Sequence, residues 1–240
     1  MVVEMRLILL LLIILPIVRS AVIDVSVADY INVDIIGFRQ ENFGEALKVS
    51  FEAFNSGSVG CNALFRVDVE GKDYSFRGWS RNPKFQPSDR KQVEFYLFFF
   101  NKTGNFTGKI RYYCANEIKE VKNFSLQSDK YVSQPTIEII SPKFFRNKIT
   151  LHVRSNNTGK FAIIPVDYPR GWIVEQKTVY INSRWPKYVE IEYFPDIWMN
   201  GKMKFVVVGE NGGYGIREVD LRKENIFNEF IFYALKILRK

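Results

Sequence analysis

The sequence predicts an all-β protein in which one β-sandwich domain is followed by a second copy of itself. Composition is the first reason, because 15% of the 240 residues are aromatic, and aromatic and β-branched side chains favour strands. The second reason is a hairpin pattern that occurs twice. Residues 105–126 predict a strand, a turn and a return strand. Residues 200–221 follow the same plan, and both segments carry an early Gly-Lys pair and an Ile-x-Glu-Val motif in the return strand.

Residues 1–20 have the layout of a secretory signal peptide, which we expect to form a helix before cleavage. Arg6 precedes an apolar run at 7–18, and small residues follow before an expected cut after Ser20 or Ala21. A helix of that length reaches about 18 Å, short of the ~30 Å hydrocarbon core of a bilayer. We therefore expect an exported protein, either secreted or held at the cell surface. A retained N-terminal anchor is the alternative, because the apolar character continues past Ala21.

Residues 21–128 predict the first sandwich. Weak alternation at 22–36 predicts one or two strands, and regular alternation of apolar and polar residues predicts a half-buried strand at 47–54. Further strands are expected at 61–69, 74–79 and 92–100, with a polar loop holding Pro83 and Pro87 at 81–90. With the hairpin, about seven strands fit into roughly a hundred residues, which is typical of an immunoglobulin-like sandwich.

Residues 135–222 predict a second immunoglobulin-like sandwich, which a polar linker at 128–134 separates from the first. Strands and turns recur in the same order, and the loops between them differ in length. The matched segments are 148–154 with 48–53, 156–159 with 55–58, and 188–194 with 92–97. A repeat of this length indicates a duplicated domain, since solenoid units are much shorter.

Cys61 and Cys114 are the two cysteines, and we expect them to form a disulfide. An even count in an exported chain favours a bridge, and the spacing is unlike that of a redox pair or metal site. The repeat places Cys61 at the start of strand C and Cys114 at the end of strand F, neighbours in one sheet. The alternative puts Cys61 on strand B, as in the bridge between sheets of antibody domains, but residues 48–54 already fill that strand.

Several of these features together resemble a known family. They are the Asn-Ser-Gly turn at 55–58, the proline-containing loop before the strand at 92–100, and the Thr-Gly-Lys-Ile-Arg-Tyr-Tyr strand at 107–113. Tandem exported modules of this kind resemble the CARDB and NEW3 immunoglobulin-like domains of archaeal and bacterial envelope proteins. The resemblance covers residues 22–222. It implies a β-sandwich that serves as a spacer, scaffold or ligand-binding module, and it carries over no catalytic residues.

Residues 224–240 predict a short amphipathic helix at the C-terminus. Apolar residues recur at helical spacing, and Lys236, Arg239 and Lys240 suit the negative end of a helix dipole. The segment is too short and too charged to span a bilayer. Two interpretations remain open. The helix either docks on the second sandwich or lies on a membrane surface or a partner protein.

The sequence contains no recognisable catalytic or metal-binding pattern. His152 is the single histidine and lies within a predicted strand, and the glycine-rich segment 209–215 joins two strands without a following helix. The net charge is +8, yet Lys and Arg are spread along the chain, so we expect no nucleic-acid partner. We therefore expect no cofactor, no metal and no enzymatic activity. An enzyme that uses carboxylates alone is the remaining catalytic hypothesis.

The favoured function is a non-catalytic adhesion, scaffold or assembly module of the cell envelope, with an envelope protein or a surface glycan as partner. The alternative is a carbohydrate-binding accessory module in which exposed tryptophans stack on sugar rings. The candidate stacking residues are Trp79, Trp172, Trp185 and Trp198. Asn-x-Ser/Thr motifs predict possible glycosylation at Asn101, Asn105, Asn123 and Asn156.

Overall fold

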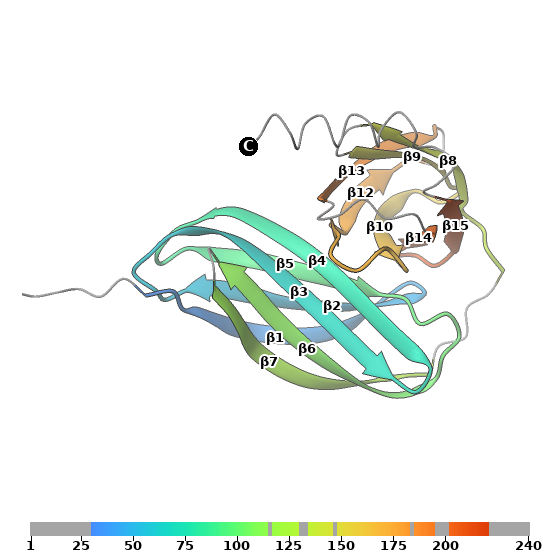
Figure 1. Ribbon diagram of the computed structural model, residues 1–240. Coiled ribbons are helices and arrows are strands. Elements are labelled where there is room, and N and C mark those ends of the chain that lie inside the picture. The colour runs from blue at the N-terminus through green and yellow to red at the C-terminus, as the bar shows by residue number, and fades with distance from the viewer. Residues whose placement is uncertain are drawn as a thin grey trace, which may run out of the picture.

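A computed structural model describes residues 30–114, 117–129, 134–145, 148–182, 185–194 and 202–220, and the regular elements in these residues are β-strands (Figure 1). The strands pair in antiparallel fashion within four sheets. The all-β prediction is therefore confirmed. The expected signal peptide at 1–20 and the expected helix at 224–240 lie outside the described residues. Within the described residues, no helix has the length and apolar character needed to cross a membrane.

The first half of the chain forms two facing sheets. Its strands are β1 (Val33–Phe43), β2 (Ala46–Asn55), β3 (Cys61–Gly71), β4 (Tyr74–Phe85), β5 (Arg90–Leu97), β6 (Gly104–Cys114) and β7 (Glu117–Ser128). One sheet has the order β1-β2-β5 and the other the order β4-β3-β6-β7. The predicted hairpin is β6 with β7, which pair from Gly104 opposite Ser128 to Cys114 opposite Glu117.

Strand β4 extends further than the sequence predicts. The expected loop at 81–90 shrinks to the residues between Phe85 and Arg90, because β4 continues through Pro83 to Phe85. Proline is tolerated there because β4 is the edge strand of its sheet, so the missing N–H breaks no central ladder. The pairing with β3 shifts register at this point, and Lys84 has a positive φ of 56°, as expected of a β-bulge.

The second half repeats the strand path of the first. Its strands are β8 (Glu138–Phe145), β9 (Lys148–Arg154), β10 (Gly159–Val166), β11 (Ile173–Val174), β12 (Lys177–Ile181), β13 (Lys187–Phe194), β14 (Lys202–Gly209) and β15 (Tyr214–Asp220). The sheet orders are β11-β13-β9-β8 and β12-β10-β14-β15. These orders correspond to β5-β2-β1 and β4-β3-β6-β7, and the two-residue strand β11 has no counterpart in the first half.

Each half has an aromatic-rich core between its two sheets. In the first half, Phe51 and Phe65 pack edge to face with ring centroids 5.9 Å apart, and both are fully buried. In the second half, Trp172 stacks on Tyr193 at 5.2 Å. Strand β3 shows why alternation predicted these strands. Its buried residues are every second one, while the intervening polar residues reach solvent.

Strands β10 and β14, the two central strands of their sheet, are buried on both faces. Ile163 and Val207 point into the second core. Their neighbours Ile164 and Val206 belong to the core cluster of the first half. Figure 1 shows β10 and β14 on the side of the second half that faces β4 and β5. The two halves therefore share a continuous apolar contact. Its residues from the second half are Ala162, Ile164, Val166, Val206, Val208 and Tyr214.

Candidate functional site at the junction of the two halves

A glutamine side chain fastens the second half to an edge strand of the first. The Gln176 amide nitrogen donates to the carbonyl oxygen of Tyr96 at 3.0 Å, and its amide oxygen accepts from the Tyr96 N–H at 2.7 Å. Tyr96 lies on β5, the edge of the three-stranded sheet, and is 1% exposed. The backbone N–H of Gln176 also donates to the carbonyl of Trp79 on β4, at 3.3 Å. One residue thus pairs with both edges of the first half, where unpaired backbone groups would be costly.

An arginine from β4 makes a second polar link. Arg81 forms an ion pair with Glu175 at 2.8 Å and another with Glu192. The Arg81 guanidinium also lies over the ring of Phe194, 4.8 Å from its centroid. Burial raises the pKa of the Glu175 carboxyl, Arg81 opposes this effect, and the negative charge of Glu192 adds to it. Arg81 therefore pairs with two carboxylates of the second half at once.

A network around Glu94 crosses the junction next to Gln176. Glu94 accepts a hydrogen bond from the Tyr96 hydroxyl at 2.8 Å and pairs with Lys48 at 2.9 Å and with Lys160 of the second half at 3.8 Å. Burial by itself acts to raise the pKa of Glu94, but the hydrogen bonds from Lys48 and Tyr96 outweigh it and lower that pKa. Burial also raises the pKa of Tyr96 to about 12, so this hydroxyl stays protonated and donates.

The turn between β1 and β2 touches the turn between β14 and β15. A Cβ built at Gly44 would overlap the carbonyl oxygen of Gly209, and the φ of Gly44 is +51°. Glycine is needed here for both reasons, since other residues rarely adopt this φ and none would fit the gap. The segment 209–215, which we predicted to be a strand connection, is confirmed as the β14–β15 turn.

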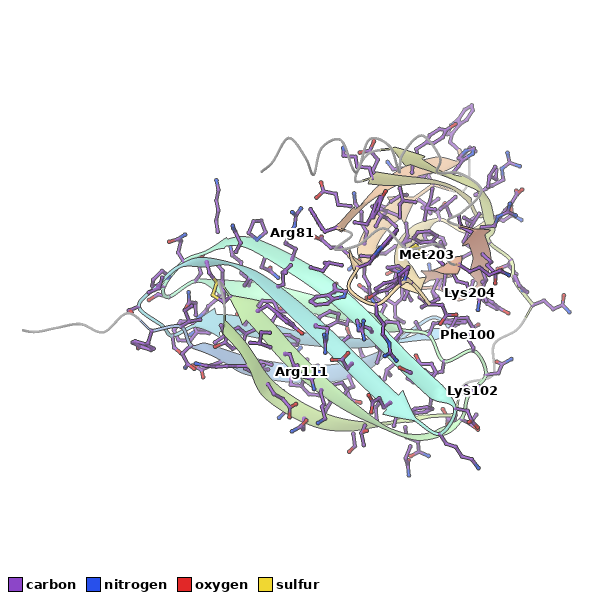
Figure 2. All side chains as sticks on the ribbon, in the orientation of Figure 1. Arg81, Phe100, Lys102, Arg111, Met203 and Lys204 are labelled. Carbon is purple, nitrogen blue, oxygen red and sulfur yellow. A yellow bond between two sulfur atoms is a disulfide. The ribbon has the colours of Figure 1, made fainter. Side chains whose placement is uncertain are left out.

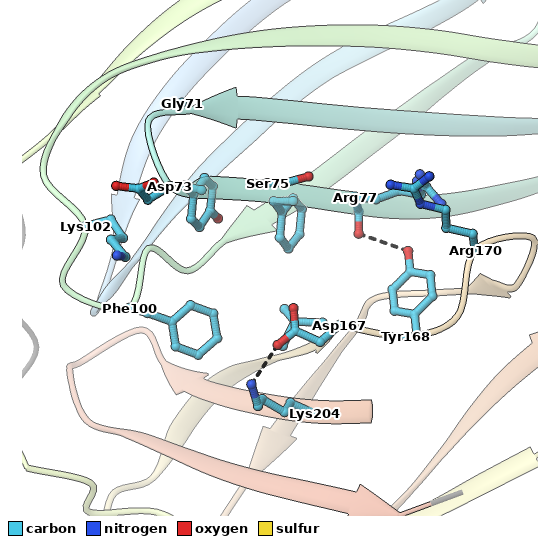
Figure 3. A pocket seen from close by; sticks show the side chains of 13 residues that line it. Gly71, Asp73, Ser75, Arg77, Phe100, Lys102, Asp167, Tyr168, Arg170 and Lys204 are labelled. Carbon is cyan, nitrogen blue, oxygen red and sulfur yellow. Dashed lines mark hydrogen bonds and ion pairs between the residues drawn. The ribbon is translucent and has the colours of Figure 1, made fainter. Parts of the chain in front are cut away.

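A cleft of about 810 Å³ opens between the two halves beside these contacts (Figure 3). The first half contributes the start of β4 and the loop after β5, and the second half contributes the end of β10, the loop that follows it and Lys204 of β14. Two hydroxyls are fixed against the first half. Tyr74 donates to the Phe98 carbonyl at 3.0 Å, and Tyr168 donates to the Arg77 carbonyl at 2.9 Å. The charged residues that line the cleft are Asp73, Arg77, Lys102, Asp167, Arg170 and Lys204.

The electrostatics of the cleft suit binding better than proton transfer. Burial raises the pKa of the Tyr74 hydroxyl, and the negative charge of Asp167 raises it further. Burial is also the main reason why the pKa of Tyr168 is raised. Both hydroxyls are thus neutral and already donate to backbone carbonyls. Asp167 is paired with Lys204 at 2.8 Å, and this hydrogen bond raises the pKa of Lys204 (Figure 3).

Unusual backbone conformations gather around the cleft. Within the described residues, six non-glycine residues have a positive φ, and three of them, Asp73, Phe100 and Asp167, line the cleft. A fourth, Asn101, follows Phe100 directly. Asp and Asn tolerate this region, whereas a bulky Phe at a φ of 50° is an outlier that the surrounding structure must hold. Such strain clusters at functional sites.

The predicted disulfide between Cys61 and Cys114 is confirmed, with the two Cα atoms 5.6 Å apart. Cys61 begins β3 and Cys114 ends β6, and these strands are antiparallel neighbours in one sheet. The bridge therefore lies within a sheet, as the C–F placement predicts, and the placement of Cys61 on the second strand is wrong. Figure 2 shows the bond near the end of the first half that lies away from the second half.

The four tryptophans differ in their environments. Trp172 is fully buried, and Trp79 is 6% exposed beneath the Arg66 guanidinium, so the prediction that these two stack on glycans is wrong. Trp172 belongs to the core of the second half, and Trp79 packs on Tyr113 with ring centroids 5.3 Å apart. Trp185 is 72% exposed, and Trp198 lies outside the described residues.

Two exposed tyrosines of the second half were not predicted, and one of them, Tyr188, is three residues from Trp185 in sequence. Tyr188 is 68% exposed, and its ring stacks on that of His152 at 4.4 Å across the β13–β9 pair. Tyr180 on β12 is 65% exposed. The exposure of Tyr188 could have been predicted from the sequence. Val189 and Ile191 mark the buried face of β13, and side chains alternate along a strand, so Tyr188 lies on the opposite, solvent-facing side.

The four candidate glycosylation sites all have exposed asparagines, as modification requires. Asn101 is in the loop between β5 and β6, next to the cleft, and Asn105 is in β6. Asn123 is in β7, where it hydrogen bonds to Glu120, and Asn156 is in the turn after β9. Occupancy of these sites stays a prediction. Among the described residues, no group of three or more metal-ligating side chains is present.

Comparisons with known proteins give weak structural similarity only. No family model and no curated protein matches the chain. Among solved structures, it is similar to β-glucosidase 3B from Thermotoga neapolitana (15% identity, TM-score 0.33) over 41% of this chain, which spans 16% of that enzyme. It is also similar to red sea bream transglutaminase (11% identity, TM-score 0.27), over 80% of this chain and 31% of that enzyme. A segment of two fibronectin type-III domains from chicken tenascin is similar at 9% sequence identity and a TM-score of 0.25. The match covers 78% of this chain and 99% of that segment. Similarities this weak support no family or activity.

Proposed function

We propose that this chain is a non-catalytic, exported or cell-envelope protein in which two immunoglobulin-like domains of the CARDB or NEW3 kind form one rigid adhesion, scaffold or assembly module. The observation that carries the proposal is the strand pair β10 and β14, which is buried on both faces and joins the two cores. The disulfide between Cys61 and Cys114 fits an oxidising compartment outside the cytoplasm.

The contact between the halves is unlike that of loosely tethered domains. Interfaces between domains of one chain are commonly small and polar, and relative motion is the default expectation unless the interface is large and apolar. Here six side chains of the second half belong to the core cluster of the first. Hydrogen bonds from Gln176 and ion pairs of Arg81 fix the orientation around this apolar centre. A module built this way holds its two outer ends at one distance and one angle, which is the physical requirement of a spacer or scaffold.

Spin-label distance measurements on the full chain test this proposal. Labels on Ile118→Cys and Tyr180→Cys report the separation of the halves, because both positions are exposed, at 62% and 65%. We expect a single narrow distance distribution that is unchanged by salt. A broad or two-peaked distribution would contradict a rigid module. Labelling of intact cells with a membrane-impermeant reagent tests the compartment, and a chain that is labelled only after lysis contradicts export.

Carbohydrate binding is the second candidate function, and the observation that favours it is the exposed aromatic surface of Trp185 and Tyr188. Exposed aromatic rings of this kind offer flat apolar faces to sugar rings. Titration of the full chain with polysaccharides should change the fluorescence of Trp185. The change should vanish in Trp185→Ala, while the buried Trp172 supplies a constant background. No spectral change with any polysaccharide, or an equal change in Trp185→Ala, counts against this function.

A further inference from the structure

We propose that the cleft between the two halves binds an acidic saccharide, that is, a short run of sugar rings carrying carboxylate or sulfate groups. The cleft volume of about 810 Å³ lies inside the range of roughly 300–1,000 Å³ that is typical of ligand sites. This inference goes beyond the scaffold role. The cleft residues also differ from the exposed residues Trp185 and Tyr188, so binding in the cleft and binding at that aromatic surface can fail independently of one another.

The charge of the cleft favours an anion. Four cationic and two anionic side chains line it. Lys204 is paired with Asp167 at 2.8 Å, and Arg77 with Asp68 at 3.6 Å. In the described part of the chain, the side chains of Lys102 and Arg170 take part in no ion pair, although both line the cleft. Asp73 also lines the cleft and has no ion pair among the described residues, so the three unpaired charges, Lys102, Arg170 and Asp73, sum to +1. Asp68 is shared by Arg77, Arg66 and Arg111, which adds to the positive charge on this side of the cleft.

The positions of the two unpaired cations favour a ligand with more than one negative group. Figure 3 shows Lys102 and Asp73 at one end of the cleft and Arg170 at the other, with Ser75 and Arg77 between them. A single small anion could meet only one of the two ends. A chain of sugar rings with an acidic group on successive rings could place one group near each end.

The aromatic lining favours sugar rings as the body of that ligand. Tyr74, Phe100 and Tyr168 line the cleft and are partly exposed, so a part of each ring can contact the apolar C–H faces of a sugar, although Tyr74 also packs on Phe99 and Phe106. The hydroxyl hydrogen bonds of Tyr74 and Tyr168 hold two of these rings in place. Asp73 can accept hydrogen bonds from sugar hydroxyls, a contact that a purely anionic ligand would not use.

An acidic peptide fits the cleft less well. An extended peptide commonly binds by adding a strand to an exposed sheet edge, here the edge of β4. The outward-facing carbonyls of Arg77 and Trp79 on that edge are already occupied, by the Tyr168 hydroxyl and by the N–H of Gln176. Within the cleft, the stretch of edge that is left runs only from Tyr74, where β4 starts, to Phe76, which is too short for a strand ladder.

The backbone at Phe100 supports a specific site. Its positive φ of 50° turns the side chain into the cleft, where it packs at right angles to Phe98 with ring centroids 4.9 Å apart. A bulky residue in this conformation costs free energy, and such strain is retained where the position of the side chain matters. Glycine or asparagine would relieve it, and neither would supply an aromatic face.

Calorimetric titration of the full chain with four probes tests the proposal. The probes are oligogalacturonate, its methyl-esterified neutral counterpart, a sulfated heparin-derived oligosaccharide and an oligoglutamate peptide. We expect binding of at least one acidic saccharide that weakens as salt rises, with little binding of the neutral probe or the peptide. Comparison of the first and third probes shows whether carboxylate or sulfate is the preferred group.

A double variant shows whether the cleft is the site. Lys102→Gln with Arg170→Gln should weaken binding by about tenfold, since two partly solvated charge contacts are lost. The matched control is Lys187→Gln with Arg217→Gln, which removes the same charge from exposed positions outside the cleft. Both pairs lie on the surface, and thermal unfolding verifies that they fold.

Four outcomes overturn the proposal. They are absence of binding to both acidic saccharides at millimolar concentration, equal binding of the neutral probe, preference for the peptide, and equal weakening by the control pair. The last outcome would mean that the basic surface attracts anions without a defined site. None of the four bears on the rigidity of the module, which the spin-label distances measure separately.

Discussion

Replacing Gln176 with alanine should loosen the junction by a predictable amount. The substitution removes both partners of the Tyr96 backbone, whose N–H and C=O bond the Gln176 amide at 2.7 and 3.0 Å. Each buried backbone group left without a partner costs about 1–3 kcal/mol. The free energy of unfolding should therefore fall by about 2–6 kcal/mol, towards the lower value if water enters the space that the side chain leaves.

Urea unfolding and amide hydrogen exchange together measure this effect. The Tyr96 amide should exchange much faster in Gln176→Ala, because its only hydrogen-bond acceptor across the junction is gone. Gln92→Ala is the matched control, since Gln92 is an exposed glutamine on the same strand. If Gln176→Ala differs from this control by less than about 0.5 kcal/mol, the ordinary range for surface substitutions, then Gln176 does not fasten the halves and the reasoning is refuted.

Three further predictions concern other contacts. Replacing Cys61 and Cys114 with alanine should lower the free energy of unfolding by about 4 kcal/mol, the chain-entropy value for a sequence separation of 53; a loss below about 1 kcal/mol in urea unfolding would contradict it. Gly44→Ala should lower the calorimetric unfolding temperature far more than Gly37→Ala, because both positions have positive φ but only Gly44 faces a backbone oxygen; equal losses would rule out a steric cause. Because the fold lowers the pKa of Glu94, its stabilisation is full above the ordinary value of 4.5 and is lost as pH falls below it. Glu94→Gln should flatten this acid limb of the stability curve, and an unchanged limb would exclude Glu94 as its source.

Local patterns in the sequence were sufficient to predict most strands and the disulfide. Alternation of apolar and polar residues at 47–54 and 148–154 predicts strands with one buried and one solvent-facing side. Strands β2 and β9 cover these segments. The turn residues between them fix where strands end. The placement of Cys61 and Cys114 followed from counting strands, because neighbouring antiparallel strands bring the start of one beside the end of the other.

The junction could not be predicted in the same way, although part of its signal was visible. The segments 161–166 and 205–208 are continuously apolar, which indicates burial on both faces. Periodicity does not say what covers the second face. Gln176 carries no sequence signal at all, because its partner Tyr96 lies 80 residues away and is recognised through its backbone. Aromatic type alone also failed to separate Trp172, which fills a core, from Trp185, which faces solvent.

The sheet of β10 and β14 also limits how this chain can be cut and reused. Expressed alone, the second half would expose Ile164, Val206 and Val208 to water as a contiguous hydrophobic patch, and we expect such a fragment to self-associate. The first half is synthesised first, so its apolar face is available for β10 and β14 to pack against when the second half folds. Although the two halves follow one strand path, we do not expect the second half to work as an independent domain that could be fused to another protein.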